Sequence, residues 1–343
     1  MHPALALAPQ DSPTFAVPNV PPCREDPVPP FRYHLLAVGE TLIDFISNDY
    51  VETLADAAHF QRYAGGEAAN VARNVGLLGG NAAFAGCVGA DGFGRFLRHT
   101  LQGAGVDTSH LQEAPAPTTL AVVGRNTDTP DFTIYRGADA LITPQQIPEE
   151  LIRQTRAVHV SAFALSREPG RSAVFHTLQL ARKHQRLVSL DPNYHPSLWQ
   201  PEETDPLETL QRAGAFADVV KPSLDDCRRL FGTDTSPDTC LSRLLAWGVQ
   251  LVVLTMGARG VILQQADGSR WEVPARKVHV ADVTGAGDAF WAAFLLALLD
   301  GFPPPRAAEA GQAFAAKQIA TVGPLTEPVD RRALYRQLWG DAS

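Results

Sequence analysis

The chain has 343 residues, 45% of them hydrophobic and 19% charged, which is enough for one large core or two smaller ones. Its net charge of −8 at pH 7, with scattered basic residues, argues against electrostatic binding of nucleic acid. The four cysteines form no Cys-x-x-Cys pair, which favours a reducing compartment and argues against a zinc site or a disulfide framework.

The first thirty residues are rich in proline, and their one apolar patch, residues 5–8, has no basic segment before it. We therefore expect residues 1–30 to form a flexible, disordered tail rather than a signal peptide. The longest apolar run, residues 289–299, is too short to span a membrane. These features predict a cytoplasmic protein without a membrane or nucleic-acid partner.

The first half of the chain alternates between expected strands and helices. Residues 34–39 and 81–86 have the pattern of buried strands. Residues 66–79, which lie between two glycine pairs, and residues 93–103 have the pattern of helices.

Residues 118–136 interrupt this alternation. Two runs suited to strands, 118–123 and 131–136, flank a polar turn at residues 126–130, which predicts a β-hairpin. A hairpin inside an otherwise alternating chain suggests an inserted lid.

The second half returns to the alternation, with expected strands at 157–160, 187–191, 218–221 and 251–255 and a helix at 173–185. This predicts a mostly parallel sheet with helices on both faces. Ligands bind such sheets at the carboxyl ends of the strands. Five polar residues fall at or just beyond expected strand ends, which predicts one shared cleft: Asp44, Asp191, Lys221, Thr255 and Asp288.

The segment Asp-Val-Thr-Gly-Ala-Gly-Asp at residues 282–288 lies between an expected strand at 277–280 and an apolar helix. Free N–H groups at such a turn attract negative charge, and the Asp288 carboxylate could accept a proton. This combination suits phosphoryl transfer to an alcohol. The alternative is a glycine turn with an acidic helix N-cap. A dinucleotide-binding turn fits poorly because Phe290 occupies the third glycine position, and the chain has no P-loop.

These residues resemble a known family. Gly-Gly-Glu-Ala-Ala-Asn at 65–70 is similar to the first signature of the ribokinase-like (PfkB) carbohydrate kinases, and residues 282–288 are similar to the second. Residues 39–44, 89–94, 191–193 and 255–260 add to a resemblance that covers about residues 34–325. It implies an α/β fold: a ribokinase-like, Rossmann-type three-layer α/β/α sandwich at residues 31–340. A small β-sheet lid would have strands near 44–63 and 118–136, and family members often dimerise through it.

The resemblance also assigns catalytic and sugar-binding roles. Asp288 matches the catalytic base, and Gly285, Ala286 and Gly287 match the backbone anion hole. Contacts to the sugar are implied for Asp44, Gly65, Gly66, Asn70, Tyr135, Arg136, Asp191 and Asn193. The alternatives are a solvated turn acid for Asp44, a structural amide for Asn70 and a packed strand side chain for Tyr135.

The implied cofactors are ATP, Mg²⁺ and K⁺. Thr255, Gly257 and Gly260 match the segment that lines the ATP site, although they also suit a plain strand-turn-strand. Lys221 and Ser223 would contact ATP. In the family's Asn-x-x-Glu motif, Ser223 replaces Asn and Asp226 replaces Glu, and Asp226 would hold Mg²⁺ through water. Asp282 and Thr284 would contribute to a site for a monovalent cation, although Val283 replaces the usual threonine.

Two residues bear on the substrate. Glu67 stands where kinases of phosphorylated sugars often carry lysine, and a carboxylate there would repel a substrate phosphate. His195 replaces an arginine that could bind an acid sugar. We therefore expect a fructokinase-like enzyme acting on a neutral hexose, with 2-keto-3-deoxygluconate, ribose or a nucleoside as alternatives. A dehydrogenase would need a nicotinamide fingerprint, and a non-catalytic sugar-binding relative would be expected to lose Asp288 or its glycines.

Overall fold

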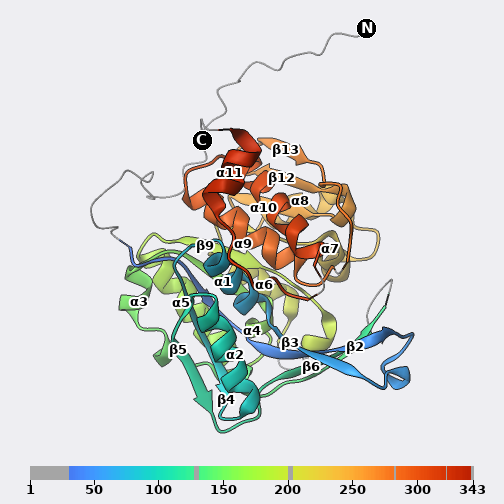
Figure 1. Cartoon of the computed structure of the whole chain (residues 1–343). Coiled ribbons are helices and arrows are strands. Elements are labelled where there is room, and N and C mark those ends of the chain that lie inside the picture. Colours follow the sequence, from blue (N-terminus) through green and yellow to red (C-terminus); the bar gives the residue numbers. More distant parts are fainter. Residues whose placement is uncertain (1–30, 127–130, 200–203, 282, 322, 341–343) are drawn as a thin grey trace.

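The computed structural model describes residues 31–126, 131–199, 204–281, 283–321 and 323–340, so the predicted tail lies outside the described residues (Figure 1). A nine-stranded sheet runs through the centre in the order β13-β12-β11-β10-β9-β8-β1-β4-β5. Its strands are β1 (Tyr33–Val38), β4 (Ala82–Gly89), β5 (Asp107–Ala114), β8 (Thr155–Ser161), β9 (Leu187–Asp191), β10 (Val219–Val220), β11 (Leu251–Thr255), β12 (Val261–Gln265) and β13 (Arg270–Val273).

The seven strands from β11 to β5 in this order are parallel, and β12 pairs antiparallel with both β11 and β13. All strands expected for this sheet are present, except that residues 277–280 form no regular strand. The prediction of a strand there was wrong, because an alternating pattern needs a neighbouring strand to pair with. Strand β5 was not anticipated.

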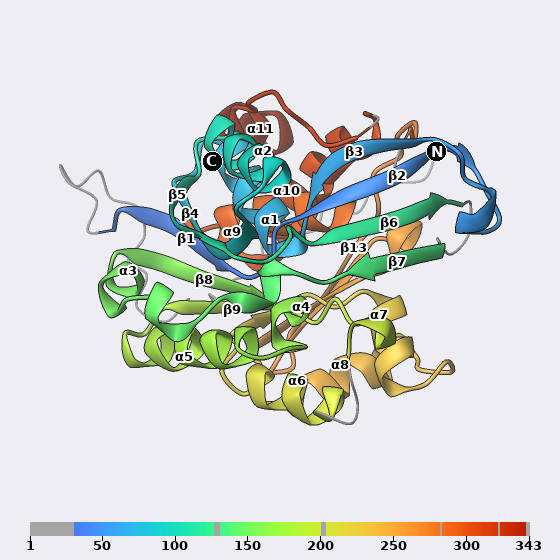
Figure 2. The ribbon, with the colours of Figure 1, turned by 90° about the horizontal axis from the view of Figure 1, so that it is seen from below.

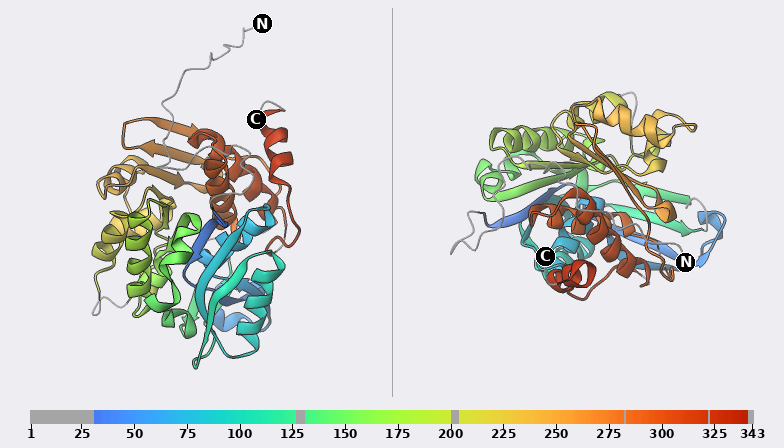
Figure 3. Two further views of the ribbon diagram at one scale, coloured as in Figure 1. Left: turned by 90° about the vertical axis from the view of Figure 1, so that its left-hand side faces the viewer. Right: turned by 90° about the horizontal axis from the view of Figure 1, so that it is seen from above.

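Two layers of helices cover the sheet, so the predicted three-layer architecture is confirmed (Figures 2 and 3). One face packs against α1 (Glu67–Leu77), α2 (Gly92–Gly103), α9 (Ala286–Leu299), α10 (Pro304–Ile319) and α11 (Arg331–Trp339). The other packs against α3 (Glu149–Arg153), α4 (Ala162–Leu165), α5 (Gly170–Lys183), α6 (Pro206–Gly214), α7 (Leu224–Phe231) and α8 (Pro237–Leu245). None of the described helices has the length and hydropathy that a membrane span requires.

A second, four-stranded sheet projects from the main body in the order β3-β2-β6-β7 (Figure 2). It consists of β2 (Leu42–Tyr50), β3 (Phe60–Gly65), β6 (Leu120–Arg125) and β7 (Asp131–Tyr135). Strands β6 and β7 form the expected hairpin, and β2 joins it in parallel register. The two segments predicted for the lid strands therefore form one sheet.

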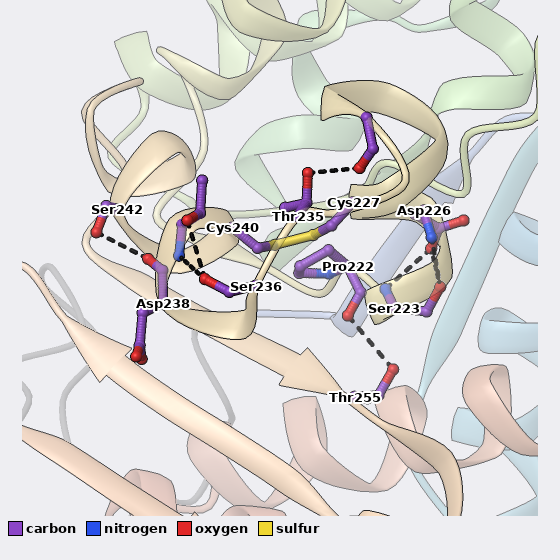
Figure 4. Close-up of a disulfide and its surroundings, with 12 residues drawn as sticks. Pro222, Ser223, Asp226, Cys227, Thr235, Ser236, Asp238, Cys240, Ser242 and Thr255 are labelled. Atoms are coloured by element: carbon purple, nitrogen blue, oxygen red, sulfur yellow. Dashed lines mark hydrogen bonds between the residues drawn. A yellow bond between two sulfur atoms is a disulfide. The ribbon is translucent and has the colours of Figure 1, made fainter.

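A disulfide joins Cys227 in α7 to Cys240 in α8, with Cα atoms 5.8 Å apart (Figure 4). The sequence argument against a disulfide framework therefore did not anticipate this one bond. Residues thirteen positions apart on two adjacent helices carry no pairing motif, and only the fold brings them together. The pairing removes the cysteine-based argument for a reducing compartment, so the cytoplasmic location stays a prediction.

Candidate active site

The site is built around the first turn of α9. Gly285 adopts the left-handed conformation (φ 72°) as the N-cap, and Ala286 begins the helix. From Ala289 onward the helix is fully buried, which fixes the position of its N-terminus. This arrangement leaves first-turn N–H groups without helical partners, beside the carboxylate of Asp288.

Helix α1 supplies the opposite wall. Glu67 and Asn70 are three residues apart and so lie on one face of this otherwise alanine-rich helix. The side chain of Asn70 donates a hydrogen bond of 2.9 Å from Nδ2 to Asp288 Oδ2. The guanidinium of Arg73 is buried one turn further on. Its positive charge lowers the pKa of Asp288.

The carboxyl ends of the central strands bring two more charged residues to the same place. Asp191 ends β9 and Lys221 follows β10, and Lys221 Nζ lies 2.5 Å from Asp191 Oδ2. One carboxylate oxygen each from Glu67, Asp191 and Asp288 lies within 4.8 Å of the other two. Lys221 Nζ also lies 3.6 Å from where a Cβ on Gly287 would stand, so the ammonium group is next to the glycine turn.

This concentration of carboxylates changes their acidity. Burial raises the pKa of Asp288 to about 6, while Lys221 and the hydrogen bond from Asn70 act in the opposite direction. Burial and the charges of Asp288 and Glu40 raise the pKa of Asp44 to about 7. Asp44 lies within β2 rather than at a strand end, but its electrostatic coupling to Asp288 places the two in one neighbourhood. Perturbed carboxyl groups in a cleft are typical of proton-transfer sites.

Glu67 is held by a buried relay that sequence reasoning missed. Trp291 Nε1, which can only donate, bonds to Ser189 Oγ at 2.8 Å, and Ser189 Oγ lies within hydrogen-bond distance of His159 Nδ1, at 2.9 Å. A hydrogen bond of 2.9 Å joins His159 Nε2 to Glu67 Oε1. Burial lowers the pKa of His159 to about 3, which keeps it neutral. The only signal was a histidine at the centre of a buried strand.

The position of Glu67 bears on the argument about the substrate. Its carboxylate is buried against His159, and burial together with Asp191 and Asp288 raises its pKa well above the usual value. The sequence argument placed Glu67 against a substrate phosphate. A carboxylate committed to His159 is a weaker obstacle to such a phosphate than that argument assumed.

The glycine pair of the first signature is explained by internal packing. A Cβ on Gly65 would collide with the Asp44 carboxylate. Gly66 has a φ of 99°, and a Cβ there would meet the backbone of Glu40 at 2.6 Å. Both glycines therefore allow β2 and α1 to approach each other, which brings Asp44 close to the N-terminus of α1.

A second group of predicted residues gathers around the start of α7 (Figure 4). Ser223 and Asp226 form a capping box, in which Asp226 Oδ2 accepts hydrogen bonds from Ser223 N at 2.9 Å and Oγ at 2.6 Å. Thr255 donates from its backbone N–H to Pro222 at 3.0 Å. Gly257 and Gly260 follow β11 with φ angles of 57° and 90°, so this turn requires glycine. Asp226 therefore has a structural role, and its Oδ1 is left for Arg229 at 3.5 Å.

The structure does not bring Tyr135 and Arg136 into this cluster. Tyr135 is 62% exposed, so the alternative that it packs under the small sheet was wrong. The buried guanidinium of Arg136 binds Asp139 at 2.6 Å and Ser166 at 2.8 Å. His195 stacks edge-on against Phe132 of β7, with ring centroids 4.6 Å apart.

The remaining predicted residues lie at the edges of the site. Asn193 has a φ of 32° and donates its backbone N–H to Asp191 at 3.0 Å. Thr284 precedes the glycine turn, and its carbonyl accepts a hydrogen bond from Gln318. Asp282 lies outside the described residues.

Comparison with known proteins shows which family the chain belongs to. Residues 33–330 match the family model "pfkB family carbohydrate kinase". The chain is 35% identical over 300 residues to an ATP-dependent 6-phosphofructokinase from Thermoanaerobacterium thermosaccharolyticum, covering 87% of this chain and 92% of that protein. It is 37% identical over 265 residues to Fructokinase-1 from Oryza sativa subsp. japonica, covering 76% and 81%.

Solved structures agree. A fructokinase from Halothermothrix orenii superposes with a TM-score of 0.73 at 36% identity, covering 81% of this chain and 97% of that one. A fructokinase variant from Vibrio cholerae, solved in a fructose-, ADP- and potassium-bound form, has a TM-score of 0.77 at 29% identity and covers 90% and 99%.

Proposed function

The chain belongs to the PfkB family of carbohydrate kinases, and we propose that it transfers the γ-phosphoryl group of ATP to a hydroxyl of a neutral hexose, with fructose as its substrate. The observation that carries this proposal is the Asp288 carboxylate, which is held by Asn70 beside the N–H groups that begin α9. A proton acceptor next to anion-binding donors is what such a transfer needs.

The reaction follows from these positions. The sugar hydroxyl oxygen forms a bond to the γ-phosphorus, the bond from that phosphorus to the β–γ bridging oxygen breaks, and ADP leaves. Asp288 takes the hydroxyl proton. The backbone N–H groups of Gly285 and Gly287, with the Lys221 ammonium beside them, would stabilise the negative charge on the phosphoryl oxygens. The Ala286 N–H, which donates to the Val283 carbonyl at 3.2 Å, would have to turn from that carbonyl to join them.

We assign the sugar to the side of Asp288 that faces Asp44 and the nucleotide to the side that faces Thr255. An ionised Asp44 would accept hydrogen bonds from sugar hydroxyls, and a protonated Asp44 could also donate one. Asp44 lies in β2, which is a strand of the small sheet, and this sheet would act as the lid over the sugar. Its exposed tyrosines, Tyr50 and Tyr135, would lie in a homodimer contact between two such sheets.

Mg²⁺ would accompany ATP and neutralise charge on its phosphates. The oxygens of Glu67, Asp191 and Asp288 lie within 4.8 Å of one another, but Glu67 is bound to His159, Asp191 is paired with Lys221 and Asp288 is assigned to the sugar hydroxyl, so we do not assign the ion to this cluster. Asp226 would hold Mg²⁺ through a water on Oδ1, which also lies 3.5 Å from Arg229, because its Oδ2 is occupied by Ser223.

The choice of a neutral hexose rests on the charge of the site. Five carboxyl groups, those of Glu40, Asp44, Glu67, Asp191 and Asp288, lie near only two cations, Lys221 and Arg73, and burial raises the pKa of Glu40 and Asp44 to about 7, so a further negative charge would be poorly compensated. An acid sugar such as 2-keto-3-deoxygluconate would add a further negative charge. Fructose 6-phosphate is the second candidate, because a 6-phosphofructokinase is among the similar proteins and Glu67 faces His159.

The test is ADP release from ATP–Mg²⁺ with fructose, glucose, ribose, 2-keto-3-deoxygluconate, fructose 6-phosphate and adenosine. We expect the highest kcat/KM with fructose. A preference for fructose 6-phosphate would contradict the assignment of a neutral substrate, and the absence of turnover with every compound would contradict a sugar kinase with any of these substrates.

A further inference from the structure

Arg73 is a buried cation without an anion beside it. The residue lies in helix α1 and is 7% exposed. Among the described residues, its Nε has no hydrogen-bond partner and its guanidinium forms no ion pair. A charge taken out of water destabilises a fold unless it is paired and hydrogen-bonded. Stability therefore gives no reason for an arginine at this position.

The place of Arg73 on α1 brings its side chain to the active site. Arg73 follows Asn70 by three residues, so the two side chains leave the helix on the same face. Helical side chains lean toward the N-terminus, and Asn70, which is bonded to Asp288, lies one turn away in that direction. Burial lowers the pKa of Arg73, and the negative charge of Asp288 raises it. Arg73 is therefore near enough to Asp288 to interact with its charge, although the side-chain hydrogen bond to Asp288 comes from Asn70.

The second cation near Asp288 is already paired. Lys221 Nζ lies 2.5 Å from Asp191 Oδ2, and both side chains are buried. Lys221 and Arg73 act on the charge of Asp288 from different elements, the end of β10 and helix α1. Of these two cations, Arg73 is the one that has no anion among the residues that the structure describes.

A buried guanidinium in this state suits an anion that is bound only during turnover. In the proposed reaction, the transferred phosphoryl group is the anion that comes next to Asp288, because it is attacked by the hydroxyl whose proton Asp288 takes. Guanidinium donors form a planar fork that matches phosphoryl oxygens. We propose that Arg73 is a further catalytic residue, which binds the oxygens of the phosphoryl group as it passes from ATP to the sugar hydroxyl, a role that rests on the proposed function.

Arg73 itself neither gains nor loses a covalent bond in this step. The sugar oxygen bonds to the γ-phosphorus, the bond to the β–γ bridging oxygen breaks, and the hydroxyl proton goes to Asp288. Arg73 keeps its protons, because a guanidinium is not deprotonated in proteins, and it donates hydrogen bonds to the non-bridging oxygens. These bonds form to the group in transit rather than to bound substrate, so they act on kcat more than on KM.

The test compares the wild type with Arg73→Met, Arg73→Lys and the control Arg332→Met, which removes an exposed arginine of α11. The first readout is Tm without ligand, with ADP–Mg²⁺, and with ADP–Mg²⁺ plus aluminium fluoride and each compound of the ADP-release assay. Aluminium fluoride beside ADP imitates the phosphoryl group in transit, so this readout needs no turnover. The second readout is kcat and KM for ADP release.

Without ligand, we expect Arg73→Met to melt no lower than the wild type, because an apolar side chain replaces an unpaired buried charge. ADP–Mg²⁺ should raise Tm equally in all variants and the wild type. The further rise with aluminium fluoride should be lost in Arg73→Met and kept in Arg332→Met. Arg73→Met should lower kcat by about 10²–10³-fold and leave the KM values within about threefold of the wild type. Arg73→Lys should recover part of the lost kcat.

An equal response to aluminium fluoride in the wild type and Arg73→Met would overturn the proposal, as would the absence of this response from the wild type. A lower Tm of Arg73→Met with unchanged kcat would also overturn it, because that result indicates a packing role. A raised KM for an acidic or phosphorylated sugar with unchanged kcat would overturn it in favour of a contact with substrate charge. A wild-type Tm that does not respond to ADP–Mg²⁺ at all would overturn the proposed function, and this role of Arg73 with it.

Discussion

Asn70 Nδ2 lies 2.9 Å from Asp288 Oδ2 and joins the first turn of α1 to the first turn of α9, across 218 positions of the sequence. The two family signatures therefore meet through one hydrogen bond. The bond donates to the carboxylate form of Asp288 and so favours its ionised state.

The first prediction concerns this bond. A base must be ionised, so activity should fall as the pH drops through the pKa of Asp288, about 6. Asn70→Ala removes a contact that lowers this pKa, so the acid limb of kcat/KM should move to higher pH. A hydrogen bond worth roughly 0.5–1.5 kcal/mol corresponds to about half to one pH unit. The exposed Asn81→Ala is the control, and an acid limb unchanged in Asn70→Ala would contradict the assignment.

The second prediction concerns stability. The folded-state pKa of Asp44 is raised from 3.8 to about 7, so the native protein binds more protons than the unfolded chain between these values. The contribution of Asp44 to stability therefore decreases as the pH rises from about 4 to 7. Asp44→Asn should raise Tm at pH 8 by roughly 2–4 °C for each kcal/mol gained, and the gain should shrink toward pH 4. The control is the exposed Asp49→Asn on the same strand, whose Tm change should not depend on pH. A gain in Tm for Asp44→Asn that is the same at pH 4 and pH 8 would contradict a raised pKa of Asp44.

The third prediction concerns Lys221. Lys221→Met should lower kcat by about 10²–10³-fold, as expected for the loss of one preorganised charge at a phosphoryl group. It should also destabilise the fold, because it leaves Asp191 as an unpaired buried charge. The double variant Lys221→Met/Asp191→Asn should recover Tm without recovering kcat. Recovery of both Tm and kcat would mean that Lys221 acts only on the fold. The exposed Lys317→Met serves as the control.

The fourth prediction concerns the disulfide. A cross-link across thirteen positions stabilises by about 3 kcal/mol in the chain-entropy description, so a reductant should lower the wild-type Tm. Cys240→Ala should start at the lower Tm and be insensitive to the reductant. Because α7 begins at the Ser223 capping box, we also expect reduction to raise the KM for ATP while leaving the KM for sugar unchanged. A Cys240→Ala variant that still responded to the reductant would contradict this pairing; Cys87 is the free cysteine among the described residues.

Local patterns in the sequence were enough for most of the fold. Buried strands, glycine-bounded helices and the 118–136 hairpin each depend on neighbouring residues, and the structure confirms them. The segment at 277–280 shows the limit, since its alternating pattern has no strand partner.

The site was predictable where a motif carried it and hidden where contacts join distant segments. Asp288 and Asn70 belong to recognisable motifs, and their hydrogen bond follows from the topology of α1 and α9. The pairing of Glu67 with His159 spans 92 positions, and nothing in either local sequence indicates it. The same holds for Gln318, whose amide reaches 34 positions back to Thr284. The ion pair of Arg136 with Asp139, three residues later, was not anticipated either, and its contact with sugar stays a prediction.

The central claim is that Asp288 accepts the proton of the sugar hydroxyl. The most direct measurement is the rate of ADP release with fructose and ATP–Mg²⁺ at pH 8 for wild type and Asp288→Asn, with thermal melts to show that both are folded. The amide cannot take the proton, so kcat should fall by about 10²–10⁴-fold while the KM values change little. A folded Asp288→Asn protein that retains wild-type kcat would contradict the account.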